Sequence, residues 1–145
     1  MSLRRLHLLG SPVLRQRAHE VAGVDEGVRT LIADLFETMR AAKGVGLASN
    51  QIGVARRVAV VSVENEGEYA LVNPVIIETG GTQLGEEGCL SIPGRLGEVS
   101  RATRIKVHAL DREGREFWLD ADDYFARAIQ HENDHLDGVL LSWWL

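Results

Sequence analysis

The sequence predicts a single α+β domain in which two helices pack against mostly antiparallel strands. Three observations support this fold class. The chain has 145 residues, enough to bury one hydrophobic core without disulfide bonds. Apolar residues recur at helical spacing in one segment of each half of the chain, and short β-branched runs lie between these segments. No repeat, low-complexity tract or linker divides the sequence, so we expect one domain over residues 1–145.

The first predicted helix spans residues 25–43. Asp25 is suited to cap its first turn, and Gly44 can end it after the basic Lys43. One stripe of apolar side chains recurs along it at intervals of three and four residues: Val28, Leu31, Ile32, Leu35, Phe36, Met39 and Ala42. We therefore expect this long helix of the N-terminal half to bury one face in the core.

Two extended segments follow a glycine-rich stretch at 44–53. The β-branched run 58–63 predicts a buried strand. Residues 69–77 are expected to continue as extended chain. Pro74 then lies either at a sheet edge or at a break, because proline cannot donate a ladder hydrogen bond.

A β-hairpin is predicted for the segments 105–110 and 115–119. Apolar and polar residues alternate in both, and Gly114 in the intervening turn can adopt a positive φ. Trp118 is expected to pack in the core from this hairpin.

The second predicted helix spans residues 120–136. Phe125, Ile129, Glu132 and Leu136 fall on one side of it, so we expect that side to face the core.

Two histidines of this helix indicate a metal site. His131 and His135 are four residues apart, so both imidazoles leave one helix face and can bind one metal ion. Glu132 lies beside the first histidine, where its carboxylate can reach a metal-bound water without ligating the metal. The alternative is a surface helix with two histidines by coincidence, which is uncommon when a chain has only five.

A catalytic metal normally has three protein ligands and one open position. Cys89 is the only thiol in the chain, and glycines and Pro93 around it suggest a shaped loop or a strand end. A single cysteine is more often a small buried hydrophobe than a ligand. Because the histidine pair lacks a third ligand, we favour Cys89 as that ligand over Cys89 as a buried apolar residue. A thiolate ligand favours softer metal ions.

Composition restricts the class of protein. The formal net charge of -5 argues against a general nucleic-acid surface. A single cysteine excludes an intrachain disulfide, and nothing indicates an oxidising compartment. No apolar stretch approaches the ~20 residues that span a bilayer, and the apolar run near the N-terminus is too short for a secretory signal. We expect a cytoplasmic protein with no membrane partner and no direct nucleic-acid partner.

Three segments in this order resemble the peptide deformylase family: residues 44–51 (Gly-Val-Gly-Leu-Ala-Ser-Asn-Gln), 87–91 (Glu-Gly-Cys-Leu-Ser) and 130–135 (Gln-His-Glu-Asn-Asp-His). Residues 8–15 show weaker similarity, so the resemblance covers nearly the whole chain. A His-Glu-x-x-His match alone is only moderately specific. Three segments in order, one of which supplies the thiol, are much more specific.

The resemblance implies the following roles: metal binding by Cys89, His131 and His135, general acid and base catalysis by Glu132, and oxyanion stabilisation by the Gln51 side-chain amide and the Leu90 backbone N–H. It also implies one divalent metal ion per chain, most often ferrous iron, with zinc, nickel or cobalt able to replace it. The implied reaction removes the formyl group from the N-terminal methionine of newly synthesised proteins. Metal-bound water or hydroxide attacks, formate is released, and N-formylmethionyl nascent polypeptides are the partners.

Substrate contacts are expected at Gly44, Val45 and Gly46. The glycines can let the backbone approach a peptide, although a simple helix stop and turn explains them equally well. Val45 and apolar residues of the second helix are candidates for a methionine pocket. An extended peptide can pair with a strand edge, which gives affinity without a sequence requirement.

Some positions depart from the family pattern. Ser49 stands where alanine is usual and would add a hydroxyl near the site, and Leu96 stands where arginine is common. We expect altered peptide contacts more than lost catalysis. The apolar run 140–145 is expected to cover apolar surface or to contact another subunit. Because a C-terminal extension helix is lacking, direct ribosome contact is doubtful.

Two further readings stay open. A zinc endopeptidase would share the helical motif but has no need for the Cys89 segment. The other is non-catalytic: an inactive or specialised deformylase-like binding protein, or a structural metal site, which would need a fourth protein ligand such as Glu87 or Glu132. Asp134 and Asp137 either orient ligand histidines or form a solvated acidic helix end, and the second interpretation is favoured.

Overall fold

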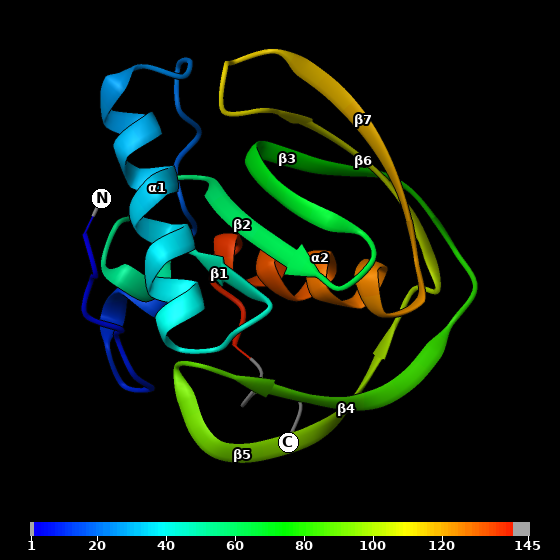
Figure 1. Ribbon diagram of the computed structural model, residues 1–145. Coiled ribbons are helices and arrows are strands. Elements are labelled where there is room, and N and C mark those ends of the chain that lie inside the picture. The colour runs from blue at the N-terminus through cyan, green and yellow to red at the C-terminus, as the bar shows by residue number, and fades with distance from the viewer. Residues whose placement is uncertain (1, 141–145) are drawn as a thin grey trace.

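The computed structural model describes residues 2–140 and contains two helices, a five-stranded antiparallel sheet and a separate two-stranded ribbon (Figure 1). The sheet has the order β1-β2-β3-β6-β7, and β4 pairs with β5. The helices are α1 (Glu26–Ala41) and α2 (Asp123–Leu136), with 3-10 turns η1 (Pro12–Arg15) and η2 (Ser49–Ile52). The strands are β1 (Gly46–Ala48), β2 (Val58–Val63), β3 (Gly67–Gly80), β4 (Gln83–Cys89), β5 (Ile92–Arg101), β6 (Arg104–Leu110) and β7 (Glu116–Asp122).

Helix α1 forms as predicted at its start and ends two residues early. The Asp25 carboxylate accepts a 2.9 Å hydrogen bond from the Val28 N–H, which caps the first turn. Lys43, not Gly44, takes the left-handed conformation after the helix, with φ 58°, and the Gly44 N–H bonds to the Met39 carbonyl. Gly44 also leaves room for the end of the Leu90 side chain, because a Cβ there would lie 2.7 Å from Leu90 Cδ1 and the leucine would have to shift.

Strand β2 is buried on both faces, which explains its unbroken β-branched run. Val58 and Val60 pack with α1, whereas Val61 and Val63 pack with α2. The two helices therefore lie on opposite sides of the sheet at this strand.

Strand β3 is longer than predicted and changes partners along its length. Its first part pairs with β2 and its second part with β6. Pro74 lies at the register shift between Val72 and Val75, where the ladder is interrupted and a missing N–H costs no hydrogen bond.

The predicted hairpin is present as β6 and β7, and Gly114 in its turn has φ 82°. The core assignment of Trp118 is wrong. Its side chain is 60% exposed and lies against His108 on the outer face, because strand alternation turns Phe117 and Leu119 inward instead.

Helix α2 begins at Asp123, three residues later than predicted, because β7 continues to Asp122. Its apolar side packs on the sheet, and the β4–β5 ribbon lies below it in Figure 1. The sequence did not reveal this ribbon, since residues 85–94 read as a shaped loop or strand end around Cys89. No helix among residues 2–140 is long and apolar enough to cross a membrane. The predicted role of the run 140–145 concerns residues 141–145, which lie outside the described residues.

Candidate active site

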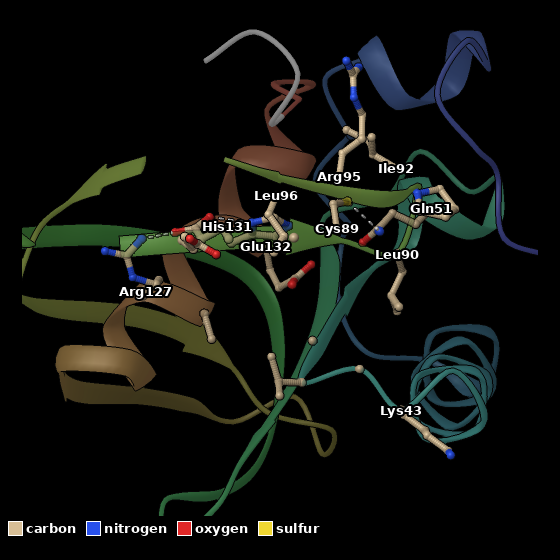
Figure 2. Close-up of a pocket in the computed structure, with 18 of the residues that line it drawn as sticks. Lys43, Gln51, Cys89, Leu90, Ile92, Arg95, Leu96, Arg127, His131 and Glu132 are labelled. Atoms are coloured by element: carbon tan, nitrogen blue, oxygen red, sulfur yellow. Dashed lines mark hydrogen bonds and ion pairs between the residues drawn. The ribbon is translucent and has the colours of Figure 1, made fainter. Parts of the chain in front are cut away.

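A cleft of about 610 Å³ opens between the segment after α1, the β4–β5 ribbon and α2 (Figure 2). It is lined by most of the predicted site residues, namely Gly44, Val45, Gly46, Gln51, Cys89, Leu90, His131 and Glu132. His135 lies behind them, fully buried.

The three predicted metal ligands converge on one point. Cys89 Sγ and His131 Nε2 each lie 3.2 Å from His135 Nε2, and all three donor atoms are within 4.8 Å of one another. Helix periodicity places the two histidines on the same face of α2. Cys89 is the last residue of β4, and the end of that strand lies against this face.

The donor set fits a metal ion. Bonds of about 2.0–2.1 Å to nitrogen and about 2.3 Å to sulfur at a tetrahedral centre separate the donors by roughly 3.3–3.6 Å. The observed separations of Cys89 and His131 from His135 are close to these values. These residues therefore suit one ion with an open position, because the described residues provide this one group of three clustered donors.

Glu87 orients His131 and is not available as a fourth ligand. Its Oε1 accepts from His131 Nδ1 at 2.9 Å and from Arg101 at 2.8 Å, while its Oε2 accepts from Arg101 at 2.9 Å and from Arg127 at 2.6 Å. Burial opposes the ionisation of Glu87, but the hydrogen bonds from Arg101 and His131 outweigh it and lower its pKa to about 2. A carboxylate that accepts the second ring N–H fixes the tautomer of a ligand histidine.

The two aspartates at the end of α2 are partly exposed and ion-paired, and Asp134 is the one that is linked to a predicted ligand histidine. Asp134 accepts a 2.5 Å hydrogen bond from Arg101, which links it to the group that orients His131. Asp137 pairs at 2.9 Å with the buried Arg57, which also donates to the carbonyl of Leu136. Arg57 thereby fixes the C-terminal end of the helix.

Glu132 is buried and points at the backbone of β1. Its Oε1 has no hydrogen-bond partner among the described residues. A Cβ on Gly46 would lie 2.5 Å from its Oε2, so only glycine leaves room for this carboxylate. Burial raises the pKa of Glu132 to about 7, against the opposing charges of His131 and Arg101. An unpaired buried carboxyl beside a donor cluster is unusual for a purely structural residue.

Gln51 lies opposite the helix, in η2, and in Figure 2 it points toward Cys89. Its Oε1 accepts from the Ala48 N–H at 3.0 Å, and its Nε2 donates to Ser91 Oγ at 3.2 Å. Leu90 follows Cys89 directly and lines the cleft. The contact of Ser91 with Gln51 was not anticipated, and Glu87 was considered only as a possible fourth ligand, although both residues lie in the segment 87–91.

The two departures from the family pattern differ in position. Ser49 is fully buried and its hydroxyl donates to the Arg56 carbonyl, so it stabilises the η2 region and is not among the residues that line the cleft. Leu96 is 66% exposed at the cleft rim.

Three clustered donors next to an unpaired buried carboxylate define the class of site that metallohydrolases use. Comparison with known proteins identifies the family. The family model described as polypeptide deformylase matches residues 3–144. The chain is 49% identical to peptide deformylase 1 of Clostridium acetobutylicum over 140 aligned residues. This alignment covers 97% of this chain and 93% of that protein.

Solved structures agree. The peptide deformylase of Ehrlichia chaffeensis in complex with actinonin matches with a TM-score of 0.98 at 37% identity, over 100% of this chain and 90% of that one. The Thermotoga maritima enzyme matches with a TM-score of 0.94 at 41% identity, over 98% and 97% of the two chains. The chain therefore belongs to the polypeptide deformylase family.

The predicted fold class and activity are thereby confirmed. The protein is a hydrolase that removes the N-formyl group from the N-terminal methionine of newly synthesised proteins. Of the activities that the sequence left open, the comparisons support this one and not an endopeptidase.

Proposed function

We propose that Cys89, His131 and His135 bind the single divalent metal ion of this deformylase, which is ferrous iron in the cell. Zinc, nickel and cobalt are substitutes that the same donors accept, because imidazole and thiolate suit all of these ions. The convergence of three donor atoms within 4.8 Å carries this proposal. Such an ion, when bound, polarises a carbonyl and lowers the pKa of water to about 7.

Glu132 acts as the general base and then the general acid. Its unpaired Oε1 is free to accept a proton from the attacking water. As the carbon–nitrogen bond of the formamide breaks, Glu132 delivers that proton to the departing amine, and the formyl carbon leaves as formate.

Gln51 and the backbone N–H of Leu90 stabilise the negative charge that develops on the formyl oxygen. Gln51 is suited to this role because its amide oxygen is held by Ala48, which turns the amide nitrogen toward Cys89. Loss of one such donor typically costs about 3–4 kcal/mol in the transition state.

Gly44, Val45 and Gly46 form the substrate-binding side of the cleft. Val45 is exposed at the rim, and Gly44 and Gly46 let Leu90 and Glu132 approach the backbone. We propose N-formylmethionyl nascent polypeptides as partners and the cytoplasm as the location. The exposed Leu96 opposite these residues contacts the peptide beyond the methionine.

Metal analysis together with a formate-release assay tests the metal site. The protein is prepared without oxygen, because a ferrous thiolate site can oxidise at sulfur. Wild type is expected to hold one metal ion per chain and to release formate from an N-formylmethionyl peptide. A chelator removes both properties, and added Fe²⁺ or Co²⁺ restores them.

Cys89→Ala is expected to lose the metal and at least about 90% of the activity. His108→Ala is the matched control, since His108 lies on β6 and is outside the donor cluster. Wild-type metal content and activity in the Cys89 variant would contradict the assignment.

A further inference from the structure

The orientation of the Gln51 amide is set by two partners. Its oxygen faces the Ala48 N–H, which can only donate, so the two amide hydrogens must point the other way. One hydrogen is directed at Ser91 Oγ, 3.2 Å away. The second is directed at Cys89 Sγ, to which Gln51 Nε2 donates over 3.7 Å, a long contact on the side of the metal-donor cluster.

Ser91 is placed as a fixed acceptor for this amide. It is fully buried, as Gln51 nearly is, so water does not compete for the bond. It lies in the turn between β4 and β5, directly after Leu90 and two residues after Cys89. Its hydroxyl is thus tied to the segment that carries the other proposed oxyanion donor.

The N-terminal segment holds the two sides together. The His7 N–H donates to the Gln51 carbonyl at 2.7 Å, and the Leu9 N–H donates to the Ser91 carbonyl at 2.8 Å. The His7 ring also lies on Gly53, where a Cβ would come within 2.6 Å of its Nε2. One extended segment therefore fixes the spacing between Gln51 and Ser91, which are 40 residues apart in the sequence.

We propose that Ser91 is a positioning residue for deformylation, which orients the Gln51 amide toward the formyl oxygen. This inference rests on the role of Gln51 in the proposed function. With one N–H held by Ser91, the second N–H keeps a fixed direction, which is what a preorganised oxyanion donor requires. Without the hydroxyl, the amide nitrogen loses its 3.2 Å partner and keeps only the long contact to Cys89 Sγ, so the direction of its N–H bonds is less fixed.

The test combines Ser91→Ala and Gln51→Ala in a double-mutant cycle, with Ser100→Ala as the control. Ser100 is an exposed serine of the same ribbon. Loss of one neutral hydrogen bond predicts a fall in kcat of about tenfold for Ser91→Ala, with KM within about twofold and metal content unchanged. Gln51→Ala is expected to lower kcat about 100- to 1,000-fold. In that background Ser91→Ala should have little further effect, because Ser91 acts only through Gln51.

All variants are assayed well below their unfolding temperatures, and Ser91→Thr, which keeps the acceptor, should recover kcat to within about threefold of wild type. The inference is overturned if Ser91→Ala has wild-type kcat, if it loses metal in proportion to activity, or if its full effect persists without Gln51. Wild-type kcat in Gln51→Ala would instead overturn the role of Gln51 in the proposed function.

Discussion

The two helices, on either side of the same strand, differ in how many ionisable side chains they bury: α1 buries Asp34, which pairs with Arg4, whereas α2 buries three. Helix α1 turns a continuous apolar stripe onto β2, with Leu35 completely buried. Helix α2 also packs on the sheet, but it buries Arg127, Glu132 and His135 as well. Both helices are amphipathic. They differ in whether the side chains of the buried face need hydrogen-bond and ion-pair partners.

Apolar groups are stabilised by removal from water, whereas buried ionisable groups cost free energy unless they are paired. Helix α2 obtains its pairing from the β4–β5 ribbon, where Glu87 and Arg101 meet Arg127 and His131. Glu132 Oε1 is one of three buried side-chain atoms of α2 without a hydrogen-bond partner among the described residues, with Asn133 Oδ1 and His135 Nδ1, and it is the one carboxylate oxygen among them. On this comparison α1 mainly stabilises the fold, and α2, supported by the ribbon, carries three of the residues that we propose for the chemistry, namely His131, Glu132 and His135.

The largest effect is expected for Glu132→Gln on α2. The amide keeps the shape of the side chain but cannot transfer the proton, so kcat should fall about 10²- to 10⁴-fold while the metal remains bound. Formate release and metal analysis measure this, with the exposed Glu98→Gln as the control. Substantial residual turnover would contradict the assigned role.

Glu87→Gln tests whether the ribbon supports the polar face of α2. It removes the charge that Arg101 and Arg127 share, and breaking a buried pair costs about 3–5 kcal/mol of unfolding free energy. Metal affinity should also fall about 10- to 100-fold, because His131 loses its orienting partner. Denaturant unfolding and metal titration measure the two effects, and the exposed Glu86→Gln should change neither.

Leu35→Ala on α1 should show the opposite pattern. A large-to-small change at this buried site is expected to lower the free energy of unfolding by about 3 kcal/mol, with kcat unchanged below the unfolding temperature. Thr30→Ala, on the exposed side of the same helix, is the control. A marked fall in kcat would show that α1 is not separate from the chemistry.

Gly46→Ala is expected to have the smallest effect. The added Cβ would displace the Glu132 carboxylate, so kcat should fall about tenfold, or about 1.4 kcal/mol, with little change in stability. Gly23→Ala adds a Cβ where no atom lies within 4 Å and should leave kcat unchanged. Equal kcat values for the two variants would mean that Glu132 tolerates displacement.

The positions of α1, β2, the β6–β7 hairpin and α2 could be predicted because each depends on a local pattern. Their ends were less predictable: α2 starts late because β7 keeps its ladder to Asp122, and Trp118 alternates to the outer face. The β4–β5 ribbon has few β-branched residues and gave no clear strand signal.

The sequence by itself determined the helical histidine pair, the neighbouring glutamate and the single thiol, since residue type and helix period are local properties. Only the tertiary structure decided that Glu87 orients His131 and that Ser91 and the N-terminal segment hold Gln51. These contacts join residues 40 or more positions apart, and their partners depend on how β4 and β5 fold under α2. No spacing rule encodes such a pairing, because hydrogen bonds form between whichever polar groups the packed elements bring within reach.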